Sequence, residues 1–166
     1  MSQGLLFDGR IAEDFKLSSG TFVSVGPLRG KVIAAGAPYV QDVVVTGINR
    51  GEIGLLIFPR LDTCRTLAAV NAGVATDAGL AEVLHSAPVR DFFQTLANTL
   101  WQGGTGSANR PARMHVLVEP PSIDKGEVTD KGSINQRAVL TARADLVEAL
   151  YEGGAADPYL IVPSKA

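Results

Sequence analysis

Two polar segments, residues 7–20 and residues 126–137, contain the charged side chains whose types and spacing could do chemistry. The second segment contains Lys131, which stands between Asp130 and Gly132. A lysine ammonium is a compact cation on a flexible stem, so a glycine-flanked lysine is suited to reach an anion and to bridge two of its oxygens. Taken alone, each segment is also compatible with a solvated turn rich in charge, which is the usual identity of such runs.

The other reactive residue types have structural interpretations. The glycine-rich stretch 103–107 follows a predicted helix and lacks the Gly-Lys-Ser/Thr ending of a phosphate loop, so we expect a surface loop. His85 and His115 have no further ligands at metal-binding spacing, and we therefore expect no metal site. Cys64 has no partner that the sequence can establish, and a buried, inert thiol is expected. The sequence contains no Gly-x-Ser-x-Gly motif of a serine hydrolase.

Composition excludes several classes of protein. Fifteen lysines and arginines against seventeen aspartates and glutamates leave a net charge of −2, which argues against a nucleic-acid partner. No apolar run approaches the ~18–20 residues that a membrane span requires, and the first residues do not resemble a signal peptide. A single cysteine excludes an internal disulfide. We therefore expect a cytoplasmic protein with no membrane contact.

The pattern of apolar residues predicts the elements that must position the two polar segments. Residues 15–18 and 21–25 alternate around a turn at Gly20, which indicates a small hairpin. The remaining pattern predicts helices at 27–39, 61–72, 77–102 with a break at Pro88, and 133–152 capped by Ser133 or Asn135, and strands at 40–46, 53–58 and 114–118. The expected fold class is α+β, with the hairpin followed by a three-stranded, mainly antiparallel sheet covered by helices.

Both polar segments resemble motifs of one enzyme superfamily. Gly9-Arg10, Glu13-Asp14-Phe15-Lys16 and Gly20 resemble the hinge motif of the adenylate-forming acid–CoA ligases, the acyl-CoA synthetase superfamily. Thr129-Asp130-Lys131-Gly132, followed by Arg137, is similar to the loop that carries this superfamily's adenylation lysine. The amino-acid sequences of residues 7–17, 23–29 and 129–137 resemble those of the feruloyl-CoA synthetase branch. The pattern departs from the superfamily at Ala12, where an aspartate or lysine is usual.

This resemblance implies the organisation of the chain. Residues 1–26 would form the hinge segment and the small hairpin, and residues 27–166 would form a mobile carboxy-terminal lid domain. The superfamily's ATP-binding motifs belong to a larger amino-terminal domain and do not occur in this sequence. We therefore expect a partner domain that binds ATP, and we expect this chain to be inactive without it.

The resemblance also implies the site residues and co-substrates. Lys131 would be the catalytic residue of acyl-adenylate formation, and Arg10 would contact the nucleotide. Lys16, Gly20 and Thr21 would line the channel for the pantetheine arm of coenzyme A. ATP, accompanied by Mg²⁺, and CoA would be co-substrates, and the acid would be a small aromatic or fatty carboxylic acid such as a hydroxycinnamic acid. The alternative is a stand-alone, non-catalytic binding module that kept the lid fold.

Overall fold

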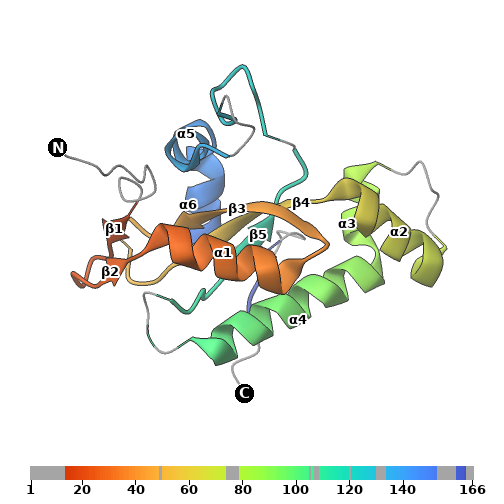
Figure 1. Cartoon of the computed structure of the whole chain (residues 1–166), viewed down its shortest axis with the longest axis horizontal. Helices are drawn as coiled ribbons and strands as arrows, with labels where there is room; N and C mark the ends of the chain where they lie inside the picture. Colours follow the sequence, from red (N-terminus) through yellow and green to blue (C-terminus); the bar gives the residue numbers. More distant parts are fainter. Residues whose placement is uncertain are drawn as a thin grey trace.

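A computed structural model describes residues 14–48, 50–73, 79–104, 106, 109–119, 121–129, 134–152 and 160–163. The elements within these residues are β1 (Phe15–Lys16), β2 (Phe22–Val23), α1 (Val25–Gly36), β3 (Val40–Thr46), β4 (Gly54–Pro59), α2 (Leu61–Ala72), α3 (Leu80–His85), α4 (Ala87–Gly103), β5 (Met114–Val116), α5 (Gln136–Ala142), α6 (Ala144–Glu152) and β6 (Leu160–Ile161). Figure 1 shows the small β1–β2 hairpin beside a larger sheet that is flanked by helices. The predicted α+β class is confirmed.

The larger sheet has the strand order β3-β4-β5-β6. Strands β3 and β4 are antiparallel, β4 and β5 are parallel, and β5 and β6 are antiparallel. The prediction of three strands is therefore wrong, because β6 adds a fourth, and the parallel pairing of β4 with β5 makes the sheet mixed. A strand of two residues is too short to show alternation in the sequence, and it exists only through its pairing with β5, where Met114 lies opposite Ile161.

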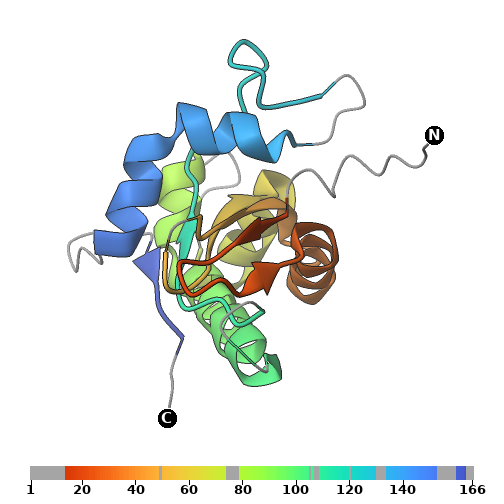
Figure 2. The same cartoon turned by 90° about the vertical axis from the view of Figure 1, so that its left-hand side faces the viewer.

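The sheet is buried on both faces. Along β3, Val43 and Val45 belong to the core on one face, whereas Val44 belongs to a second core on the other. The first core also takes residues from α1, α2, α3 and α4, and the second takes residues from α5 and α6. Figure 2 shows α6 and α1 on opposite sides of the strands. All six residues of β4 are buried as a result, which explains its continuous apolar run.

Several helix boundaries differ from the predicted ones. Helix α1 begins at Val25, before Pro27. The predicted helix 77–102 is two helices that meet at Ser86, and Pro88 lies in the first turn of α4, where a missing N–H costs no hydrogen bond. The last predicted helix is divided into α5 and α6 at Arg143. Asn135 is the N-cap of α5, since its Oδ1 accepts the Ala138 N–H at 3.2 Å.

The described part of the chain contains no helix that is both long enough and apolar enough to cross a membrane.

Candidate functional site

The sequence-predicted site residues fall into two groups. Arg10 and Lys131 lie outside the described residues. Lys16, Gly20 and Thr21 all lie on the β1–β2 hairpin and are exposed. Lys16 is paired across the hairpin with Phe22, which is also exposed. The structure therefore brings three of the five residues together on one small surface.

Backbone hydrogen bonds define the hairpin turn. The Gly20 N–H donates to the Leu17 carbonyl at 2.8 Å, and the Leu17 N–H donates to the Thr21 carbonyl at 2.9 Å. Gly20 has a φ of +88°, a backbone conformation that favours glycine. No atom lies within 4 Å of the position that a Cβ would occupy there, so another molecule has access to this backbone. The Thr21 and Ser19 hydroxyls are 2.8 Å apart beside the turn.

The hairpin is held against the body of the protein at both of its ends. The Asp14 carboxylate accepts the N–H of Val25, the first residue of α1, at 2.8 Å. This acceptor satisfies a helix N–H that has no partner within the helix, and its negative charge suits the positive end of the helix dipole. At the turn, the Ser18 N–H donates to the Arg50 carbonyl at 2.8 Å. Asp14, which belongs to the predicted hinge motif, thus has a structural role.

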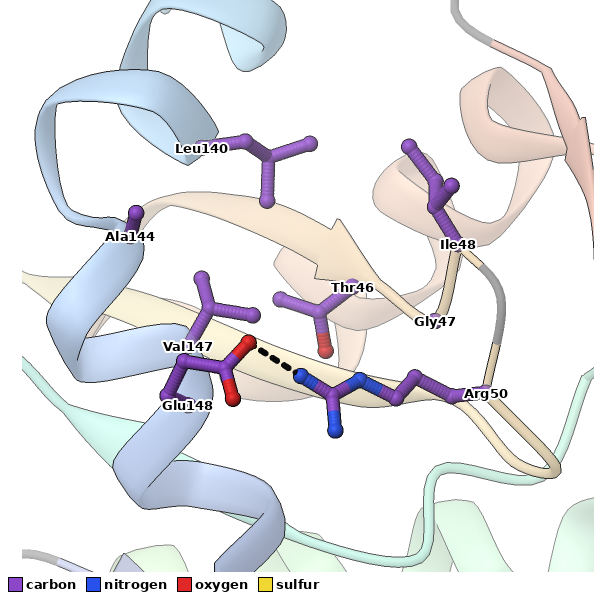
Figure 3. A pocket seen from close by; sticks show the side chains of 8 residues that line it. All are labelled: Thr46, Gly47, Ile48, Arg50, Leu140, Ala144, Val147 and Glu148. Atoms are coloured by element: carbon purple, nitrogen blue, oxygen red, sulfur yellow. Dashed lines mark hydrogen bonds and ion pairs between the residues drawn. The ribbon is translucent and has the colours of Figure 1, made fainter.

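The turn between β3 and β4 separates the hairpin from a small cavity. The cavity has a volume of about 180 Å³ and is lined by Thr46, Gly47, Ile48, Arg50, Leu140, Ala144, Val147 and Glu148. Figure 3 shows the lining side chains of α5 and α6 facing those of the β3–β4 turn. Arg50 and Glu148 form an ion pair of 2.6 Å at this cavity. The sequence does not indicate this pair, because no local pattern links residues 98 positions apart.

A second polar cluster surrounds Glu127, whose side chain is only 1% exposed. Its Oε2 accepts a hydrogen bond from Arg143 Nε at 2.9 Å, and its Oε1 accepts from Arg143 Nη2 at 3.0 Å and from the Ser122 N–H at 2.7 Å. The hydrogen bonds from Arg143 lower the pKa of the Glu127 carboxyl and outweigh the opposing effect of burial. Glu127 is therefore a buried carboxylate with a matched cationic partner.

The backbone beside Glu127 connects this cluster to the segment that contains the predicted catalytic lysine. The Glu127 carbonyl accepts the Asn135 N–H at 2.8 Å, and Val128 and Ile134 form an antiparallel bridge. The two ends of the segment 128–134 are consequently held side by side. Glu127 belongs to the polar segment 126–137, but no local pattern in the sequence indicates its partner Arg143, which lies at the α5–α6 junction.

An open hollow of about 390 Å³ adjoins the start of α5 and is lined by Lys125, Asn135, Arg137, Ala138, Thr141 and Ala142. Two of these residues are cationic and none is acidic. Among the described residues, no group of three or more histidine, cysteine, aspartate or glutamate side chains has the arrangement of a metal site. Cys64 is fully buried, as expected, and burial raises the pKa of its thiol to about 12.

Comparisons with known proteins identify the class of fold. No protein-family model matches this chain, and no curated protein matches it either. Among solved structures, the A-PCP didomain of a carboxylic acid reductase from Segniliparus rugosus, in complex with AMP, matches with a TM-score of 0.53 and 25% identity. That match covers 84% of this chain and 17% of the reductase chain.

The adenylation domain of the same reductase, in complex with AMP and a co-purified carboxylic acid, matches with a TM-score of 0.54 and 23% identity. That match covers 88% of this chain and 21% of the other, so this chain spans about a fifth of the length of these neighbours. The likenesses support the carboxy-terminal domain fold of adenylate-forming enzymes. They do not support the feruloyl-CoA synthetase branch in particular.

Proposed function

We propose that this chain is the mobile carboxy-terminal domain of an adenylate-forming carboxylic acid–CoA ligase. The observation that carries the proposal is the likeness of 84% of the chain to a small part of a reductase structure that holds AMP. The two motif-like segments described above add to it. On this proposal, residues 1–26 are the hinge and hairpin, residues 27–166 are the lid domain, and a larger domain supplies the ATP site.

The proposed reaction has two steps. In the first, the substrate carboxylate attacks the α-phosphate of ATP, which forms an acyl-adenylate and releases pyrophosphate. In the second, the CoA thiol attacks the acyl carbon, which forms a thioester and releases AMP. The first step brings two anions together, so a positioned cation lowers its barrier by several kcal/mol. We assign this role to Lys131, and we assign contact with the nucleotide to Arg10.

The hairpin is proposed to face the pantetheine arm during the second step. Lys16, Gly20 and Thr21 are exposed on the hairpin, as such a role requires. The open space around Gly20 leaves its backbone accessible to an extended, narrow ligand. The hydrogen bonds of Asp14 and Ser18 hold the hairpin in a fixed position on the domain, so this surface moves with the domain as a unit. A rotation of the whole domain then replaces the surface that carries Lys131 with the hairpin surface at the active site.

The substrate is proposed to be a small aromatic or fatty carboxylic acid, with ferulate as the first compound to test. The superfamily's acyl pocket lies in the larger domain, so the selectivity for the acid has to be measured with the complete enzyme. Mg²⁺ is expected to enter with ATP.

ATP–pyrophosphate exchange tests the proposal. We expect no exchange by the isolated chain with ferulate and ATP, and acid-dependent exchange by the chain joined to its larger domain. Lys131→Ala in the complete enzyme should suppress exchange far more than thioester formation from supplied acyl-adenylate. Lys31→Ala serves as a matched control, because Lys31 is an exposed lysine of α1, outside the proposed machinery.

Three results would contradict the proposal. Exchange by the isolated chain at the rate of a complete ligase would show that no second domain is needed. Equal losses in both half-reactions on Lys131→Ala would remove the assigned role. Absence of exchange in every arrangement would favour a non-catalytic binding module.

A further inference from the structure

We propose that Glu127 and Arg143 are positioning residues, whose buried ion pair holds the two ends of the segment 128–134 in a fixed orientation on the sheet. The inference rests on the proposed function, in which Lys131 of that segment acts in adenylation. Neither residue is proposed to touch a substrate.

Glu127 joins three parts of the chain at once. Its carboxylate accepts the Ser122 N–H at 2.7 Å, and its own N–H donates to the Ser122 carbonyl at 3.0 Å. Its carbonyl accepts the Asn135 N–H at 2.8 Å, immediately before α5. A single residue therefore closes the preceding turn and fixes the entry to the following helix, with the bridge between Val128 and Ile134 next to it.

Arg143 supplies the geometry that holds the carboxylate. Two of its nitrogens donate to the two carboxylate oxygens, and Nη1 donates to the Glu119 carbonyl at 3.1 Å. A planar guanidinium that binds both oxygens fixes their orientation as well as their distance. Its central carbon lies 5.1 Å from the centre of the Phe58 ring, so the pair is seated on the end of β4.

The start of α5 is tied to the edge strand β3. Gln136 is 2% exposed, and its Oε1 accepts the Val45 N–H of β3 at 2.9 Å. Asn135 caps the same helix end. The second end of the segment 128–134 is thus attached to β3, while the ion pair attaches the first end to β4.

The energetics favour a positioning role over a stabilising one. Taking two charges out of water is costly, and a buried ion pair is often no more stable than apolar residues of the same size. What such a pair adds is a specific geometry, because a carboxylate and a guanidinium satisfy each other in few orientations. A precise orientation matters here only if the segment between Val128 and Ile134 presents a side chain to a reaction.

The test compares Glu127→Gln with Asp42→Asn. Asp42 forms an ion pair of 2.9 Å with Arg29, and both side chains are 13% exposed, so Asp42→Asn breaks a similar pair away from the proposed machinery. In the complete ligase, we expect Glu127→Gln to lower kcat for pyrophosphate exchange by about tenfold or more, a barrier change of ~1.4 kcal/mol. Thioester formation from supplied adenylate should stay within about twofold, which corresponds to less than ~0.5 kcal/mol. Asp42→Asn should change neither half-reaction selectively.

Amide hydrogen exchange on the 166-residue chain gives a second readout that needs no catalysis. In Glu127→Gln, the Asn135 amide should exchange faster, whereas the Leu17 amide of the hairpin should be unchanged. In Asp42→Asn, the Asn135 amide should keep its wild-type rate. Arg143→Lys keeps the positive charge without the two-pronged donor geometry, and we expect a selective but smaller loss of adenylation. If Glu127→Gln does not fold, Arg143→Lys tests the positioning role in its place.

Three results would overturn the inference. The first is an equal loss in both half-reactions that follows the fraction of unfolded protein. The others are a wild-type rate of adenylation in folded Glu127→Gln and an unchanged hydrogen-exchange rate of the Asn135 amide in that variant. Lys131→Ala separates this failure from that of the proposed function. If Lys131→Ala lowers adenylation selectively and Glu127→Gln does not, only the positioning role fails. If Lys131→Ala has no selective effect, the proposed function fails, and the Asn135 amide still reports whether the pair holds the segment.

Discussion

The side-chain oxygen of Gln136 accepts the backbone N–H of Val45 at 2.9 Å, across 91 positions of sequence. Strand β3 is at the edge of its sheet, so one row of its backbone groups has no neighbouring strand to bond. Gln136 satisfies one of these groups within the buried contact of α5 with the sheet. The residue that opens α5 thus also determines where α5 lies.

We expect Gln136→Leu to destabilise the protein by ~1–3 kcal/mol, because the buried Val45 N–H would lose its acceptor. Urea unfolding of the chain measures the change. Thr141→Ala, on the exposed face of α5, is the control and should cost less. A Gln136→Leu variant as stable as the wild type would show that this hydrogen bond contributes nothing to folding.

We expect the free energy of unfolding to depend on pH through the Glu127 carboxyl. Hydrogen bonds from Arg143 hold its folded-state pKa below the unfolded value, so its contribution is complete above the unfolded pKa and is lost as the pH falls through the folded pKa. The unfolded value is about 4.3. The stability difference between wild type and Glu127→Gln should therefore be largest near neutral pH and should shrink below about pH 4.

Urea unfolding at a series of pH values measures this difference. Asp42→Asn is again the comparison for general effects of losing a carboxylate. A Glu127→Gln difference that stays constant from neutral to acidic pH would contradict the assignment of an ionised Glu127 in the folded protein.

Gly47→Ala should destabilise the contact between the hairpin and the sheet. Gly47 has a φ of +144°, and a Cβ there would lie 3.1–3.2 Å from side-chain atoms of Ile53, Leu17 and Phe15. The strained backbone and the crowding together are expected to cost ~1–3 kcal/mol. Gly51→Ala is the matched control in the same turn, because a Cβ added to Gly51 would have no neighbouring side chain or backbone within 4 Å. Equal unfolding free energies for the two variants would contradict this account.

Cys64 should not react with a thiol reagent in the folded protein near pH 8. Its side chain is fully buried in α2, and the raised pKa, about 12, leaves almost no thiolate at that pH. Colorimetric titration with a disulfide reagent should show slow labelling in buffer and rapid labelling in denaturant. Rapid labelling without denaturant would show that α2 opens readily from α3 and α4, on which it packs.

The sequence by itself determined the elements whose signals are local. Enrichment in β-branched and apolar residues predicted β3 with its observed bounds, and a composition rich in alanine and leucine predicted α2 with its observed bounds. The turn signal at Gly20 predicted the hairpin, and the polar segments directed attention to the residues around Glu127. These signals can be seen in the sequence because helix and strand periodicities repeat within a few residues.

Only the tertiary structure decided which distant residues meet. Strand β6 arises from pairing with β5, and the break at Arg143 places its guanidinium on Glu127. The ion pair of Arg50 with Glu148 joins a turn to a helix near the other end of the chain. Such contacts depend on how helices pack on the two faces of the sheet, and no short window of sequence contains both partners. The same packing holds the ends of segment 128–134 together, whereas the sequence alone marked its lysine.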